Sequence, residues 1–184
     1  MTPTIIIQSL ILLGHRNDYV VNLNPGVNII YGDADTGKSS ILELISYLLG
    51  AKKLNTYEEI ESSVKYAVLE IKLNNILYCI KRDIFTPSRA IEVYSSGYEE
   101  IDSLTPDKYH PTLKGSDESV PAFSDFLLES LRLPQLKTKQ APSKKDSAMV
   151  RFSFRDLFKY CYVDQDDLGS KKFLDGGNYP VEVK

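Results

Sequence analysis

The residues that could do chemistry are concentrated in one short stretch, YGDADTGKSS, at positions 31–40. Gly32 is followed by four residues and then by Gly37, Lys38 and Ser39, which is the spacing of a phosphate-binding loop. Glycines let successive backbone N–H groups turn towards an anion, and a helix that begins near Lys38 points its positive end at the same place. This pattern indicates binding of a nucleoside triphosphate.

The side chains of this stretch have separate predicted roles. Lys38 is expected to reach the β- and γ-phosphates, which makes it a catalytic as well as a binding residue, and the Ser39 hydroxyl is expected to ligate Mg²⁺. Ser40 supplies a second hydroxyl in the first helical turn, suited to the α-phosphate. We therefore predict a site for ATP and Mg²⁺ with these loop residues: Gly32, Asp35, Thr36, Gly37, Lys38, Ser39 and Ser40.

A strand before the loop and a helix after it are needed to position these groups. Residues 26–31, GVNIIY, form a short apolar run after an Asn-Pro-Gly turn, which predicts a buried parallel strand. After the loop, apolar residues recur at helical spacing, and Gly50 follows as a natural end of the helix. The apolar positions of this predicted helix are Ile41, Leu44, Ile45 and Leu48.

Length and composition place these elements in one globular domain. The chain has 184 residues, of which 42% are hydrophobic and 10% aromatic, enough to bury an ordinary core. The net charge of -3 implies no nucleic-acid partner by itself. Cys79 and Cys161 lack the paired spacing of a zinc or redox motif, so both are predicted to be reduced core residues. The absence of a basic signal-like start, and of any apolar run near about 20 residues, predicts a cytoplasmic protein with no membrane partner.

The segment LNPGVNIIYGDADTGKSSILELISYLLG resembles the start of an ABC-type ATPase head of the SMC, RecF and double-strand-break-repair class. The resemblance covers residues 5–50, with predicted strands at 5–13 and 19–23 around an exposed turn at 15–17. The class usually carries Asn-Gly where this chain has Ala34 and Asp35. Asp tolerates the left-handed backbone that glycine would supply, so the cradle is expected to persist in a divergent branch.

The resemblance implies an α/β fold: a P-loop NTPase lobe with a mixed or parallel core sheet and an antiparallel β-subdomain at 60–100. The residues support that subdomain independently. Segment 64–73 alternates apolar and polar residues, Asn74 and Asn75 suit a type I′ turn, and the chain returns as a strand over 76–82. Residues 91–94 are predicted to form a third strand.

The second half of the chain is predicted to hold helices and a loop over 121–170. A helix is expected at 124–133, with three leucines facing inward: Leu127, Leu128 and Leu131. The lysine-rich segment 137–151 is interpreted either as a solvated loop or as a contact to a DNA backbone. Ser153 with Asp156 resembles a capping box that opens a short amphipathic helix, and residues 160–163 are predicted to form a strand.

Two interpretations compete for the polar residues 164–167, Asp-Gln-Asp-Asp, that follow the predicted strand. As a Walker B segment, the predicted strand would bring Asp164 to the magnesium ion. In the ABC class the same place is the Q-loop, and Gln165 would then be a catalytic residue and a metal ligand, because an amide offers both an acceptor and a donor. Arg16, in the early turn, occupies a position where this class often contacts the nucleotide, so it is a further predicted nucleotide-binding residue.

The resemblance implies partners and a functional class. The signature segment, a full Walker B and a switch histidine are not found in this sequence, and the class carries them in a C-terminal lobe beyond a coiled coil. We therefore expect the 184 residues to be one ATP-binding lobe that needs the C-terminal lobe of the same protein. A second ATPase head in an ATP-dependent homodimer, DNA, and a nuclease or other effector are further expected partners, in repair or in anti-phage or anti-plasmid defence.

Other functional classes remain open on the residues alone. A self-contained small P-loop kinase would use Asp164 as its metal acid, and a nucleotide-gated scaffold would bind without turnover. A GTPase is disfavoured: residues 166–169 match D-x-x-G, but no guanine-recognition motif accompanies them. ATP hydrolysis is expected only in a composite two-head site, and not from these residues alone.

Overall fold

The computed structural model describes residues 2–33, 36–55, 58–117, 119–140 and 146–163. The chain divides into two compact units, Met1–Leu133 and Pro134–Lys184, which are described separately. Within the described residues, no helix is long and apolar enough to cross a membrane, and no cluster of three or more His, Cys, Asp or Glu side chains could hold a metal ion.

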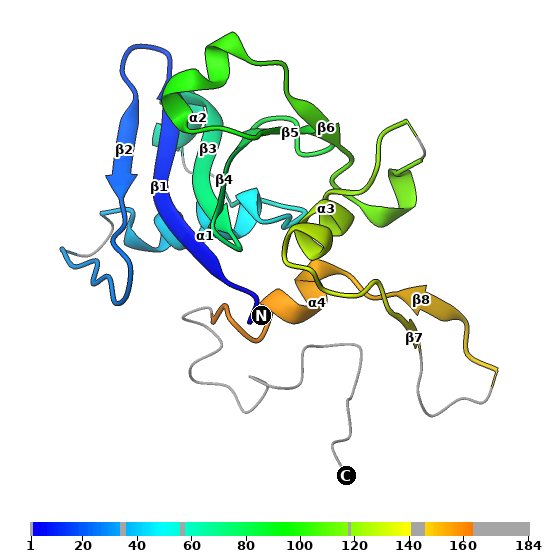
Figure 1. Ribbon diagram of the computed structural model, residues 1–184. Helices are drawn as coiled ribbons and strands as arrows, with labels where there is room; N and C mark the ends of the chain where they lie inside the picture. Colours follow the sequence, from blue (N-terminus) through cyan, green and yellow to red (C-terminus); the bar gives the residue numbers. More distant parts are fainter. Residues whose placement is uncertain (1, 34–35, 56–57, 118, 141–145, 164–184) are drawn as a thin grey trace. The chain divides into compact units, whose positions relative to one another are not determined.

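The first unit is built on one six-stranded sheet (Figure 1). The strands run in the order β2-β1-β3-β4-β5-β6, and each is antiparallel to its neighbours. Their bounds are β1 (Ile5–Gly14), β2 (Tyr19–Asn22), β3 (Val64–Leu73), β4 (Ile76–Asp83), β5 (Ile91–Tyr94) and β6 (Asp107–Tyr109).

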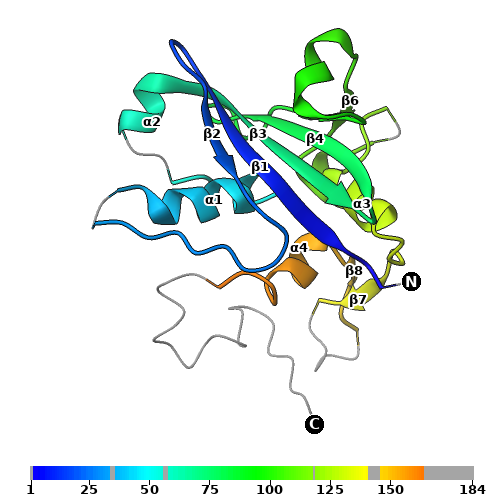
Figure 2. The same cartoon turned by 60° about the vertical axis from the view of Figure 1, so that its left-hand side comes forward.

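Two helices cover one face of this sheet (Figure 2). Helix α1 (Lys38–Leu48) packs on β3 and β4, and helix α3 (Phe123–Ser130) packs through Phe126, whose ring lies 5.2 Å from that of Tyr78. Because side chains alternate along a strand, Tyr78 shares its face of β4 with Ile80 and Arg82. The inward leucines predicted for α3 are confirmed as buried: Leu127, Leu128 and Leu131.

Shorter elements complete the first unit. Helix α2 (Glu58–Ser63) precedes β3, and the 3-10 helix η1 (Tyr98–Ser103) covers the other face of the sheet. A second 3-10 turn, η2, spans Leu113–Gly115. The second face has its own apolar cluster, in which Ile101 of η1 joins sheet residues Ile11, Val68, Cys79 and Tyr94.

The turn between β3 and β4 confirms the predicted hairpin. Asn74 and Asn75 have φ angles of 48° and 68°, the left-handed pair that a type I′ turn requires. The Asn74 side chain also accepts a hydrogen bond from the Thr4 amide at 3.0 Å and donates one to the Ser130 carbonyl at 3.0 Å. The turn therefore ties the approach to β1 to the end of α3.

The predicted buried strand at 26–31 is wrong in this structure. These residues form no strand, and Val27, Ile29 and Tyr31 are 90%, 81% and 90% exposed. Locally, the Asn28 side chain closes a turn with Asn24, accepting from its amide at 2.9 Å and donating to its carbonyl at 2.8 Å. A buried parallel strand needs neighbouring strands and covering helices, and no strand of the described chain pairs with residues 26–31.

The sheet itself also differs from the expectation. The predicted strands at 5–13 and 19–23 and the predicted β-subdomain form one continuous antiparallel sheet, because β1 pairs with β2 on one side and β3 on the other. The only parallel pairing in the described residues is an isolated bridge between His110 and Ala122. The mixed or parallel core sheet is therefore not seen in the described part of the chain.

The second unit contains a small hairpin and a short helix. Strands β7 (Lys137–Lys139) and β8 (Met149–Arg151) pair antiparallel, so both ends of the predicted loop are strands. Helix α4 (Phe154–Phe158) opens with the predicted capping box: the Ser153 amide donates to the Asp156 carboxylate at 2.8 Å.

The predicted strand at 160–163 is wrong. The chain continues from α4 in a turn, with the Tyr162 amide donating to the Phe158 carbonyl at 3.0 Å. Phe154, Phe158 and Tyr162 stack at helical spacing, with ring centroids 5.6 Å and 5.9 Å apart. This spacing overrides the strand preference of the aromatic and β-branched residues, and it leaves Cys161 exposed rather than in a core.

Candidate functional site

The loop before α1 ends in a glycine whose backbone few other residues could adopt. Gly37 is the N-cap of α1 and has a φ of 77°, in the left-handed region. Among the described residues, no side chain caps the first amides of α1 or adds a negative charge in its first turn, at the positive end of the helix.

The Lys38 side chain folds back into this loop. Its ammonium donates to the Asp33 carbonyl and, at 3.1 Å, to the Thr36 hydroxyl, and that hydroxyl donates to the same carbonyl at 2.8 Å. Both acceptors of Lys38 are neutral oxygens. The loop therefore already gathers a cation, a helix N-terminus and a hydroxyl around one place, a donor set that fits a phosphate group.

The other predicted loop residues differ in accessibility. A Cβ atom on Gly32 would lie 3.2 Å from the Thr36 hydroxyl oxygen, tighter than ordinary contact, so this glycine permits the close approach of the two loop arms. Ser39 is exposed, so its hydroxyl is open to a metal ion, whereas Ser40 is only 7% exposed. The contact of Ser40 with an α-phosphate stays a prediction.

The described structure does not test the roles of four predicted residues. Asp35, and Gln165 with its competitor Asp164, lie outside the described residues. Arg16 is exposed in the turn between β1 and β2, which Figures 1 and 2 both draw apart from the loop before α1. The role of Arg16 at the nucleotide stays a prediction.

The turn that carries Arg16 is itself well defined. The Gly14 amide donates to the Asp18 carboxylate at 3.2 Å, and a Cβ atom on Gly14 would lie 2.1 Å from the Asn17 carbonyl oxygen. Gly14 is therefore required by the tight return of the chain rather than by a ligand.

The far end of α1 contacts a buried guanidinium that belongs to no sequence motif. Arg82 is 1% exposed, and its guanidinium donates to the carbonyls of Tyr47 and Ala51 at 2.5 Å and 2.7 Å. It also lies 3.8 Å from the centre of the Tyr47 ring. The alternation of β4 could have found it, because Arg82 falls on the same face as the buried Ile80.

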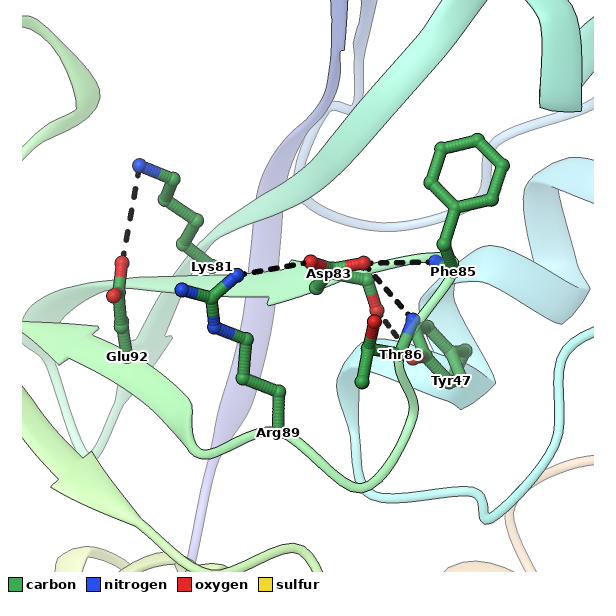
Figure 3. A network of polar contacts seen from close by, with 7 residues as sticks. All are labelled: Tyr47, Lys81, Asp83, Phe85, Thr86, Arg89 and Glu92. Carbon is green, nitrogen blue, oxygen red and sulfur yellow. Dashed lines mark hydrogen bonds and ion pairs between the residues drawn. The ribbon is translucent and has the colours of Figure 1, made fainter.

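Next to this arginine, Asp83 organises the chain between β4 and β5 (Figure 3). Its carboxylate accepts from the amides of Phe85 and Thr86 at 2.8 Å and 3.0 Å, and it pairs with Arg89 at 3.3 Å. The Tyr47 hydroxyl donates to the Asp83 carbonyl at 2.6 Å. Burial raises the pKa of Tyr47, with the Arg82 cation opposing that shift, so this hydroxyl stays a donor at neutral pH.

Comparison with known proteins agrees with the loop geometry. No curated protein matches this sequence. A family model described as an AAA domain matches residues 10–175, which span nearly the whole chain and include the complete loop and α1. The chain therefore belongs to the AAA domain family of P-loop nucleotide-binding ATPases.

Proposed function

We propose that this chain is the ATP-binding N-terminal lobe of an SMC-like ATPase, and that it binds ATP with Mg²⁺ at the loop before α1. The observation that carries the proposal is the placement of the Lys38 ammonium among neutral oxygens at the start of α1, which no described side chain caps. Phosphate oxygens are stronger acceptors for an ammonium than a carbonyl or a hydroxyl, so Lys38 would exchange its loop partners for the β- and γ-phosphates.

The remaining groups of the loop have distinct parts in this proposal. The α1 amides would donate to phosphate oxygens, and the exposed Ser39 hydroxyl would hold Mg²⁺, which supplies charge neutralisation when bound. Gly37 keeps the loop in the conformation that lets these donors converge. Gln165 is proposed as the residue that completes the metal site.

The exposed apolar run before the loop supports a composite protein. Val27, Ile29 and Tyr31 present large apolar side chains that are at least 81% exposed, next to the nucleotide loop. Contiguous apolar exposure of this kind usually marks an interface. The proposed occupant is the C-terminal lobe of the same protein, which would supply the missing catalytic segments. A second head in an ATP-dependent dimer would complete the site.

The proposed link to DNA rests on the resemblance and on the charge of the β7–β8 hairpin. Lys137 and Lys139 are exposed on β7, and Arg151 lies opposite Lys137 in the register. Exposed cations on a two-stranded ribbon suit phosphate contacts that carry no sequence information. A role in repair or in defence, with a nuclease or other effector, is proposed on the resemblance alone.

The test is a binding titration of Mg-ATP with the purified chain, using calorimetry, beside Lys38→Ala and Ser39→Ala. The wild type should bind, Lys38→Ala should bind at least about tenfold more weakly, and Ser39→Ala should lose the Mg²⁺ dependence of binding. Light scattering of the full-length protein should show a dimer only with ATP and only with Lys38. A chain that binds no ATP, or that phosphorylates a small molecule unaided, would overturn the proposal.

A further inference from the structure

We infer that Arg82 is a positioning residue for the nucleotide loop, acting through α1 from the opposite end of that helix. The inference rests on the proposed function, because it concerns the same loop. The juxtaposition that motivates it is a buried guanidinium between the end of the helix that begins at Lys38 and the loop that follows β4.

The guanidinium contacts both of these elements. On the helix side, it donates to the Tyr47 carbonyl, in the last turn of α1, where carbonyls have no partners within the helix. It also donates to the Ala51 carbonyl, just beyond the end of α1. On the other side, it donates to the Pro87 carbonyl at 3.0 Å. The planar fork of arginine suits several carbonyls at once, which a lysine ammonium on a flexible stem does not reproduce.

Helix termination alone does not require this arginine. Gly50 has a φ of 95° and its amide donates to the Tyr47 carbonyl at 3.0 Å, while the Leu49 amide donates to the Ile45 carbonyl at 3.0 Å. These bonds already end α1 in a glycine-terminated turn. The buried cation adds a second hold on the same end and complements the negative pole of the helix.

The other side of Arg82 is also fixed. Asp83 holds the amides of Phe85 and Thr86 and pairs with Arg89, so the loop that offers the Pro87 carbonyl is itself anchored (Figure 3). A rigid 11-residue helix is roughly 16 Å long and moves as a unit. A tilt at its held end therefore displaces the first-turn amides and Lys38 at the other.

The test compares Arg82→Lys and Arg82→Met with Arg89→Ala in the whole chain. Arg89 is a matched control because its side chain is 61% exposed and it anchors the same loop. At a temperature where circular dichroism shows every variant folded, Arg82→Lys should weaken Mg-ATP binding by about twofold to thirtyfold. Arg82→Met should weaken it more, and Arg89→Ala should change it by less than about twofold.

Hydrogen exchange supplies a readout that does not depend on nucleotide. In Arg82→Lys, exchange should rise most at the hydrogen-bonded amides of α1, residues 42–48, whereas a merely structural role would raise it evenly over the sheet. Wild-type affinity and unchanged exchange in Arg82→Lys would overturn the inference while leaving the proposed function intact. If wild type and Lys38→Ala alike fail to bind ATP, the proposed function fails, and exchange at residues 42–48 still decides the positioning role.

Discussion

The ammonium of Lys38 lies 3.1 Å from the hydroxyl of Thr36, and both groups donate to the carbonyl of Asp33. These contacts hold the cation inside the loop. A phosphate would replace two neutral acceptors with charged ones, and charge-assisted hydrogen bonds are roughly twice as strong as neutral ones. The loop is therefore organised for an anion rather than closed against one.

Replacing Lys38 by alanine should remove the charge-assisted hydrogen bonds to phosphate, with little effect on the fold. Lys38→Ala should weaken Mg-ATP binding by at least about tenfold, because a hydrogen bond to a charged group contributes about 1.5–3 kcal/mol. The free energy of unfolding should change by about 1 kcal/mol or less, because the side chain lies at a partly exposed loop. Calorimetry and urea unfolding check the two numbers, with Lys72→Ala of β3 as the control. Equal affinities in Lys38→Ala and wild type would contradict the assignment.

Gly37 offers a test of the loop conformation itself. Gly37→Ala should cost about 1–2 kcal/mol of stability, because φ is 77° and alanine is strained there, and it should also reduce ATP affinity. The matched control is Gly26→Ala: Gly26 has a φ of 99°, lies outside the loop and has open space around its Cβ position. Both variants should melt earlier in thermal scans, but only Gly37→Ala should bind ATP less tightly. If Gly26→Ala lost as much ATP affinity as Gly37→Ala, the loss in Gly37→Ala would be attributed to general destabilisation and not to the loop conformation.

Elements with strong local signals could be predicted from the sequence. The bounds of β3 and β5, the Asn74-Asn75 turn and the helix after the loop agree with the structure. In each case the signal is carried by neighbouring residues: strict alternation, two turn residues of the right type, or a helical repeat ended by Gly50. The loop residues could be predicted for the same reason, since a fixed spacing encodes their geometry.

Features that depend on residues far apart in the chain could not be predicted from the sequence. The run 26–31 has the composition of a buried strand, but burial depends on a neighbour that the described chain does not place there. The alternation of β4 places Arg82 on the buried face, but its partners could not be predicted, because Tyr47 and Ala51 lie more than thirty positions away along the chain. The segment 160–163 was misassigned because contacts between Phe158 and Tyr162 outweigh local strand preference.

The turn between β3 and β4 should contribute to stability through a side chain as well as through its backbone. Asn74→Ala should cost about 1–3 kcal/mol, because it leaves the Thr4 amide and the Ser130 carbonyl without their partner. Asn75→Ala carries the same left-handed strain at φ 68° and should cost about 1 kcal/mol. Chemical denaturation of the two variants separates the contribution of the Asn74 side-chain hydrogen bonds from that of the backbone strain. Equal losses would show that the Asn74 hydrogen bonds contribute nothing beyond the turn.

The two thiols should differ sharply in reactivity. Cys79 is fully buried, and burial, followed by the Glu70 carboxylate, raises the pKa of its thiol from 9.0 to about 12. Cys161 is exposed. At pH 8 an aromatic disulfide reagent should therefore modify the thiol of Cys161 quickly. Cys79 should react slower by a factor of about a thousand or more, since it must wait for opening of the fold.

The raised pKa also fixes the direction of the pH dependence. Because the folded chain holds the Cys79 proton more tightly than the unfolded chain, this thiol contributes its full stability below pH 9 and loses it as the pH rises from 9 towards 12. Cys161→Ser should remove the fast reaction and leave this decline unchanged, whereas Cys79→Ala should flatten the decline. Two thiols that react at the same rate in the folded chain would contradict the burial of β4 in the core, and with it the sheet on which α1 is held.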